Sequence, residues 1–298
     1  MSDKIKSLIL GSLIGDSLSL GVHWEYNPHK IAKDHGRVET YLAPDADSYH
    51  PGKTAGDFTH YGDQEMVLLE SVAERGRFDP DDYFERWREM FGDYAGYVDK
   101  ATKLTLENIA AGAGPGASGS DSSDMSAASR LAPLFLSGTE NLEELIRESR
   151  AMSAMTHNNP VVLDATEFLV RTTHSVLEGA GTVEAIKAAA SAGYESGLLA
   201  DWVEQGLASL EKETMRAVGR FGRSCPVENL FPGVIHILAK HPDDLKAGLV
   251  ESVMTGGDNA ARAMYVGTVL GAACGMDGIP EEWIDGLNQK EKILKLLG

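Results

Sequence analysis

Helical periodicity dominates the hydrophobic pattern of this chain. Asp79-Pro80 offers an N-cap followed by a proline suited to the first turn, and the apolar positions after it recur every three or four residues. Asn159-Pro160 is a second start signal, for a helix that we expect to reach Glu178. The same spacing predicts further helices from an N-cap at Thr182 to Ala190, over 201–218 and over 243–254.

Alternation typical of a strand is confined to the short segment from Val38 to Leu42. The first predicted helix, from Lys4 to Leu20, carries Gly11 and Gly15 among large apolar residues. Glycines lower helix propensity, so their presence there predicts close contact with another helix at the centre of a bundle. We therefore expect an all-α protein with a single domain over residues 1–298.

Composition and charge narrow the classes of partner. The chain has 298 residues, a formal net charge of −18 and two cysteines. This excess of acidic residues disfavours nucleic acid and anionic membrane surfaces, and two cysteines are too few for a disulfide framework or a thiolate zinc site. We expect a cytoplasmic protein with no nucleic-acid or membrane partner; its oligomeric state stays open.

Polar residues gather in four segments whose surroundings look buried. Asp, His and Asn stand there at the entrances to apolar helices, as in metal, sugar or phosphate sites at helix N-termini. The segments are Gly15-Asp16 with 21–26, residues 56–66, the loop 112–130, and residues 256–262.

The loop contains Gly114-Pro115-Gly116-Ala117-Ser118-Gly119, which formally matches a dinucleotide-binding fingerprint. That motif requires a preceding strand, whereas Leu104 to Ala110 has the pattern of a helix, so we reject a dinucleotide fold. The loop could wrap a diphosphate with its N–H groups, or it could be an ordinary loop. His23 and His60 could meet in space, or each could be a hydrogen-bonded structural group.

Taken together, the ordered motifs resemble those of the ADP-ribosylglycohydrolase family. The resemblance extends from about residue 5 to residue 287 and is closest to the branch that includes a lens crystallin. It implies an orthogonal multi-helix bundle that removes ADP-ribose from its attachment with two magnesium ions held mainly by carboxylates. The matching motifs are Gly15-Asp16, Asp63-x-x-Met66, Ser129-Arg130-Leu131-Ala132-Pro133-Leu134, Thr156-His157, Gly256-Gly257-Asp258, and Gly267 to Gly275 with Ile279-Pro280-x-x-Trp283.

The metal motifs depart from the family pattern. Catalytic members carry Thr-Asp-Asp-Thr and Gly-Gly-Asp-Thr-Asp-Thr where this chain has Tyr-Gly-Asp-Gln at 61–64 and Gly-Gly-Asp-Asn-Ala-Ala at 256–261. Two acids, Asp63 and Asp258, stand where the family has four. A further acid that lies near the metals in the family corresponds here to His23 or to Glu25.

Two carboxylates compensate the charge of two Mg²⁺ ions poorly. Arg262 lies at i+4 from Asp258, so we expect its guanidinium to neutralise that carboxylate, and we expect His60 to act similarly on Asp63. We therefore expect no two-magnesium centre and at most a single weakly held Mg²⁺ at Asp63 and Asp258.

Two functions follow as hypotheses. In the first, the protein is a hydrolase of a small-molecule or ADP-ribosylated substrate and cleaves an N- or O-glycosidic bond of an ADP-ribosyl or related ribosyl compound. Its candidate catalytic acids are Asp63, Asp258 and Glu25. The resemblance implies that Ser118, Gly119 and Ser120 hold the diphosphate and that His157 holds the distal ribose, while His23, His60 and Arg262 complete the ligand site. In the second, the chain is a non-catalytic ligand-binding or crystallin-like structural protein. Arg130 is expected to close the loop by pairing with Asp121 or Asp124.

Overall fold

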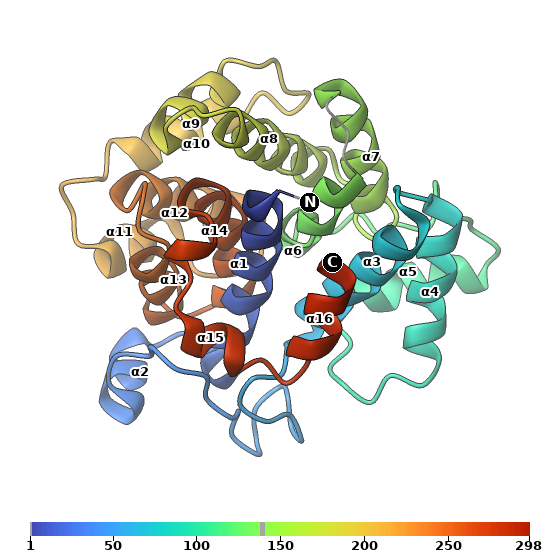
Figure 1. The fold of residues 1–298 in the computed structure, drawn as a ribbon, viewed down its shortest axis with the longest axis horizontal. Helices are drawn as coiled ribbons and strands as arrows, with labels where there is room; N and C mark the ends of the chain where they lie inside the picture. Colours follow the sequence, from blue (N-terminus) through green and yellow to red (C-terminus); the bar gives the residue numbers. More distant parts are fainter. Residues whose placement is uncertain (1, 138–140) are drawn as a thin grey trace.

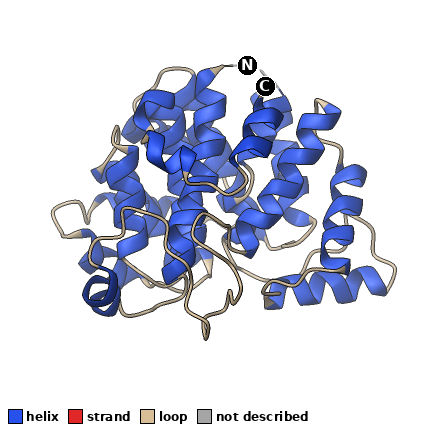
Figure 2. Cartoon of the chain, turned by 60° about the horizontal axis from the view of Figure 1, so that its bottom comes forward, coloured by secondary structure: helices blue, strands red, loops and turns tan. Residues whose placement is uncertain are grey.

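The computed structural model describes residues 2–137 and 141–298, and its secondary structure there is helical without any strand (Figures 1 and 2). Two isolated β-bridges, Ser120 with His157 and Asp124 with Pro226, join loop segments. The helices are α1 Asp3–Ser19, α2 Pro28–His35, α3 His60–Arg75, α4 Pro80–Gly92, α5 Lys100–Ala110, α6 Ser126–Ser129, α7 Leu142–Ala154, α8 Pro160–Leu177, α9 Thr182–Ala190, α10 Leu199–Leu207, α11 Thr214–Phe221, α12 Val227–Lys240, α13 Leu245–Met254, α14 Asn259–Cys274, α15 Glu281–Asp285 and α16 Lys290–Leu297, with 3-10 turns η1 Leu20–Val22, η2 Ala132–Ser137 and η3 Met276–Gly278.

Local capping explains where several helices begin. The Asp79 side chain accepts a hydrogen bond from the Asp82 N–H at the start of α4, and Asn159 accepts one from the Val161 N–H at the start of α8. Both start signals are confirmed. The predicted cap at Thr182 is off by one residue, because Gly181 is the N-cap of α9 and the Thr182 hydroxyl donates to the Pro242 carbonyl instead.

Two expectations about secondary structure are wrong. Val38 to Leu42 forms no strand, because no neighbouring extended segment pairs with it. Residues 201–218 do not form one helix: α10 ends at Leu207, and the connection to α11 is held by tertiary hydrogen bonds. Among these, the Lys240 ammonium donates to the Leu210 carbonyl at 3.3 Å. That contact comes from α12 and has no local sequence signal.

The centre of the bundle is the pair α1 and α14, which lie side by side (Figure 1). A Cβ atom on Gly11 would lie 2.3 Å from the Gly267 carbonyl oxygen, and one on Gly267 would lie 2.1 Å from the Gly11 carbonyl oxygen. The glycines therefore let the two backbones touch, as their position in the first helix predicted. By length and composition alone the segment Asp3–Val22 could cross a membrane, but 83% of its most apolar window is buried inside the protein, as in the core helix of a soluble protein.

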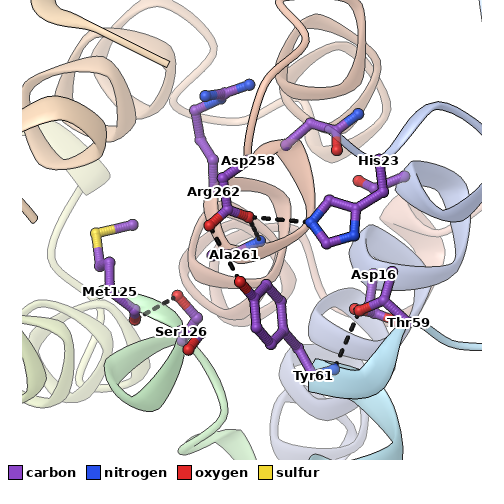
Figure 3. A network of polar contacts seen from close by, with 12 residues as sticks. Asp16, His23, Thr59, Tyr61, Met125, Ser126, Asp258, Ala261 and Arg262 are labelled. Carbon is purple, nitrogen blue, oxygen red and sulfur yellow. Dashed lines mark hydrogen bonds and ion pairs between the residues drawn. The ribbon is translucent and has the colours of Figure 1, made fainter. Parts of the chain in front are cut away.

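The fold brings distant polar segments to one region. The N-termini of α3 and α14, the η1 turn that follows α1, and the loop leading into α6 converge there (Figure 3). A helix N-terminus exposes unpaired N–H groups, so this region favours negatively charged side chains.

Candidate functional site

Asp258 lies at the centre of the polar region, as the N-cap of α14 (Figure 3). Its Oδ1 lies 3.3 Å from His23 Nε2 and accepts from the Ala261 N–H at 3.2 Å, and its Oδ2 accepts from the Tyr61 hydroxyl at 3.3 Å. The side chain is fully buried. Burial opposes ionisation, but hydrogen bonding from His23 and the Ala261 N–H outweighs it and holds the pKa of Asp258 below its usual value. Asp258 is therefore a buried, ionised carboxylate.

The structure distinguishes between the two residues that could stand beside Asp258. His23 contacts the carboxylate directly, whereas the Glu25 side chain turns toward α2, where it accepts from the Asn27 N–H at 2.8 Å and lies 3.5 Å from the Lys30 ammonium. The Glu25 carbonyl nevertheless accepts from the Gly257 N–H at 2.8 Å. Glu25 thus supports the loop before Asp258 through its backbone.

Arg262 does not neutralise Asp258 by direct contact, so that prediction is wrong. Its buried guanidinium points away from His23 and Tyr61 (Figure 3) and donates to the carbonyl oxygens of Ser252, at 2.9 Å, and Gly256, at 2.6 Å. The i+4 spacing puts the Cα atoms on one face, but the first helical turn after a cap lets the long side chain reach back to the preceding loop. Arg262 therefore ties the end of α13 to the Gly256-Gly257 turn.

Asp63 also has a partner other than the predicted one. Its Oδ2 accepts from the Lys53 ammonium at 2.7 Å and from the Tyr94 hydroxyl at 2.5 Å. His60, which was expected to serve Asp63, places its Nε2 3.1 Å from Asp99 Oδ2 instead. His60 and Asp63 are three residues apart, yet the first turn of α3 turns their side chains to different neighbours.

Asp16 holds the start of α3. Its two oxygens accept from the Thr59 N–H at 2.7 Å and from the Thr59 hydroxyl at 2.5 Å. Burial is the main reason that the pKa of Asp16 is raised to about 7, against the lowering effect of both Thr59 hydrogen bonds. A Cβ on Gly62 would lie 2.5 Å from Asp16 Oδ2, so glycine is required there by this close approach.

The loop residues predicted to hold a diphosphate lie together with His157, but their side chains are already occupied. The buried hydroxyls of Ser118 and Ser120 donate to the carbonyls of Met155, at 2.7 Å, and Thr156, at 3.0 Å. A Cβ on Gly119 would lie 2.0 Å from the Ala154 carbonyl oxygen. These contacts close the loop onto the end of α7 and leave backbone groups, rather than hydroxyls, for a ligand.

His157 is buried beside this loop, and its Nε2 has no hydrogen-bond partner. Burial, assisted by the positive charge of Arg130, lowers the pKa of His157 to about 3, so the ring is neutral. Arg130 pairs with neither Asp121 nor Asp124, contrary to expectation: its guanidinium donates to the Gln64 side chain and, at 2.7 Å, to the Thr156 hydroxyl.

Asp124 is the site residue whose chemistry the sequence did not reveal. One of its carboxylate oxygens, one of Asp258 and the Cys225 sulfur lie within 4.8 Å of one another, and Asp124 is half-buried where Asp258 is fully buried. Desolvation, followed by the charges of Asp258 and Asp99, raises the pKa of Asp124 to about 8. Two adjacent acids therefore have opposite protonation states at neutral pH. The only sequence signal was that Asp124 ends the polar loop.

A cavity of about 270 Å³ opens on the outer side of His23. Trp24, whose backbone φ of 64° is unusual for a residue other than glycine, stacks on the His23 ring with centroids 4.3 Å apart. The Trp24 N–H donates to the Gly257 carbonyl at 3.0 Å, which fixes this strained position. The cavity is lined by residues of 21–25 and of α2, and by Asp45, Asp47, Ser48 and Tyr49.

Comparison with known proteins identifies the family. The family model for ADP-ribosylglycohydrolase matches residues 1–298. The chain belongs to the ADP-ribosylglycohydrolase family. A solved structure described as an ADP-ribosylglycohydrolase-related protein complex superposes with a TM-score of 0.77, at 22% identity, over 99% of this chain and 95% of that one. The all-α bundle is thus the fold of ADP-ribosylglycohydrolases, as the motifs implied.

Relatives of this ADP-ribosylglycohydrolase family member include lens proteins. Crystallin J1A of Tripedalia cystophora is 22% identical over 98% of this chain and 94% of its own length. An uncharacterised protein of Archaeoglobus fulgidus is 25% identical over 99% of the chain and 95% of its own length. The expected similarity to a crystallin-containing branch is confirmed.

Proposed function

We propose that this protein hydrolyses an N- or O-glycosidic bond of an ADP-ribosyl or related ribosyl compound with a pair of carboxylates, without the two-magnesium centre that the family implies. The observation that carries the proposal is the adjacent pair Asp124 and Asp258, whose pKa values are displaced in opposite directions. One acid that is protonated and one that is ionised at neutral pH are what glycosidic cleavage requires.

Each residue of the pair has a defined role. Asp124, the more accessible and protonated member, donates its proton to the leaving-group oxygen or nitrogen. Asp258, ionised and fixed by His23 and Tyr61, stabilises the positive charge that develops at the ribosyl carbon. Water then adds to that carbon, and its proton returns to Asp124, which completes the hydrolysis.

The carboxylates that remain from the metal motifs do not fit two magnesium ions. Asp63 accepts a hydrogen bond from the Lys53 ammonium, and both carboxylate oxygens of Asp16 accept hydrogen bonds from Thr59. The side chains that hydrogen-bond to Asp258 are His23 and Tyr61, and Asp124, whose raised pKa keeps it protonated at neutral pH, is a further carboxylate beside it. Mg²⁺ takes near-octahedral oxygen shells, so a positive ammonium and an imidazole in these positions disfavour it.

The test measures release of ribosyl product from ADP-ribosylated peptides, nucleotides and nucleosides, with EDTA and with Mg²⁺. We expect turnover that survives EDTA and falls above about pH 8, where Asp124 loses its proton. Asp124→Asn should reduce turnover at least about 100-fold and abolish that alkaline limb. Asp121→Asn, an exposed neighbour in the same loop, is the matched control and should change neither. Turnover that needs Mg²⁺ would refute the carboxylate mechanism.

The second candidate is a non-catalytic binding or structural protein. It is favoured by the complete burial of Asp258 beneath Tyr61 and by the crystallin relatives. Calorimetric titration with ADP-ribose distinguishes the two non-catalytic possibilities. Binding without turnover indicates a ligand-binding protein, and no binding indicates a structural protein. For either candidate we also propose a single domain in the cytoplasm, with no nucleic-acid or membrane partner, which the acidic net charge supports.

A further inference from the structure

Three buried histidines from separate segments meet beside Asp258. His23 follows the η1 turn, His50 lies in the loop between α2 and α3, and His60 is the first residue of α3. One ring nitrogen from each lies within 4.8 Å of the other two. No spacing in the sequence links these three residues.

Two of the rings face each other edge to edge. His23 Nδ1 lies 2.9 Å from His50 Nε2, and the two ring planes are only 7° apart. The His60 ring centroid lies 6.0 Å from that of His23 and 5.5 Å from that of His50. Without a metal, one of these two nitrogens donates a hydrogen bond to the other. When the donor's proton moves to its second ring nitrogen, both in-plane lone pairs point into one space.

The remaining nitrogens have an arrangement typical of metal ligands. A metal-binding histidine usually donates its second N–H to a carboxylate, which orients the ring. Here Asp258 lies 3.3 Å from His23 Nε2 and Asp99 lies 3.1 Å from His60 Nε2. His50 Nδ1 and both ring nitrogens of His60 are buried without a hydrogen bond, which is costly for polar atoms, and His60 Nε2 has only the short approach to Asp99.

We propose that His23, His50 and His60 bind one divalent transition-metal ion of the zinc class. Imidazole nitrogen suits Zn²⁺, Cu²⁺ and Ni²⁺ rather than Mg²⁺, and three protein ligands with one open position are typical of non-structural zinc sites. Tetrahedral bonds of about 2.0 Å separate two ligand atoms by about 3.3 Å, so the His23 and His50 nitrogens need to part by only a few tenths of an ångström. One His60 ring nitrogen, within 4.8 Å of a nitrogen of each of the other two histidines, is the third ligand.

Aromatic rings pack against two of the three histidines. Trp24 packs on His23 with ring centroids 4.3 Å apart, and Tyr97 packs on His60 at 5.3 Å. The site adjoins the proposed hydrolytic pair, because His23 Nε2 also contacts Asp258. Asp124 and Asp258 are not its ligands, so the hydrolysis is still expected to survive EDTA.

The experiment strips the full-length protein with chelator and titrates it with Zn²⁺, and separately with Mg²⁺, by calorimetry. We expect one Zn²⁺ per chain, which a large excess of Mg²⁺ does not displace, and a Co²⁺ derivative with an intense visible spectrum of tetrahedral type. His50→Ala lies in a loop and should preserve the fold, as checked by circular dichroism, while weakening Zn²⁺ binding at least tenfold. His29→Ala, an exposed histidine of α2, is the matched control and should bind like the native chain.

Three results would overturn the proposal: no stoichiometric Zn²⁺ binding by the native chain, equal affinity of the native and His50→Ala proteins, or equal loss with His29→Ala. If His50→Ala unfolds, His50→Gln and an X-ray absorption count of histidine ligands in the native protein replace it. Fewer than three imidazoles in that count contradicts the site. Hydrolysis in EDTA is measured in parallel, so the two proposals can fail separately.

Discussion

At the residue scale, the site depends on carboxylates that differ in what surrounds them. Hydrogen-bond donors hold the pKa of Asp258 below its usual value, whereas burial and the nearby acids Asp258 and Asp99 raise the pKa of Asp124. Asp63 forms an ion pair with the Lys53 ammonium. Burial raises the pKa of Asp16 as well, so aspartates of this region differ in pKa although their side chains are identical. Environment rather than residue type sets the chemistry.

The titration of Asp16 links this site to stability. Its pKa is about 7 in the folded protein and 3.8 ordinarily, so the folded state binds the extra proton between these values and loses stability as pH rises from about 4 to about 7. In Asp16→Asn that loss disappears. The unfolding free energy of the variant minus that of the native protein should therefore rise across this range, by about 4 kcal/mol at most, and level off above about pH 8.

Urea unfolding at pH values from 4 to 8 measures that difference. Asp81→Asn, at an exposed position of α4, serves as control and should show no comparable trend. A difference for Asp16→Asn that does not change with pH would contradict the raised pKa.

At the element scale, α1 and α14 carry the architecture and the position of Asp258. The carbonyl oxygens of Gly11 and Gly267 each occupy the space of a Cβ on the other residue. Because both partners are rigid helix backbone, neither can move aside as a flexible side chain would.

Gly11→Ala should therefore destabilise the protein by about 3 kcal/mol or more, despite the better helix propensity of alanine. Gly92→Ala, at the end of α4 where nothing lies near the added methyl group, is the matched control. It should change the free energy of unfolding by no more than about 1 kcal/mol, toward greater stability. Urea denaturation checks both, and equal effects would mean that the α1–α14 contact is not tight.

At the scale of the whole molecule, the C-terminus completes the bundle. Helix α16 packs on α3, whose first turn carries His60 and Tyr61, and Figure 2 shows the chain ends close together. Lys292 on α16 forms an ion pair of 2.5 Å with Glu70 on α3. Helix α16 thus stabilises the position of α3, which carries residues of the site.

Ile293 and Leu294 test this brace with neighbouring residues of similar size. Ile293 is fully buried, whereas Leu294 is 36% exposed. Ile293→Ala should cost about 2–5 kcal/mol of stability, and Leu294→Ala should cost less than about 1 kcal/mol. The midpoint of urea unfolding, compared at equal slope, measures both; similar losses would show that α16 does not bury a defined face.

Much of the fold could be predicted because its signals are local. Asp79 and Asn159 cap their helices through N–H groups two or three residues away. The glycines of the first helix predicted its close contact with another helix. The presence of His23 and Asp258 in one region followed from the family resemblance. These features depend on a few consecutive residues or on motif order, which the sequence displays directly.

The partners of the site residues were not predictable in this way. Lys53 reaches Asp63, Asp99 reaches His60, and Arg262 turns away from Asp258, although His60 and Arg262 had the favourable spacing. Asp124 and Asp258 are 134 residues apart in number and meet only through the packing of α14 against α6. Local hydrogen bonding sets where helices begin and end, but which side chain faces which carboxylate depends on how distant helices pack, and no short stretch of sequence records that.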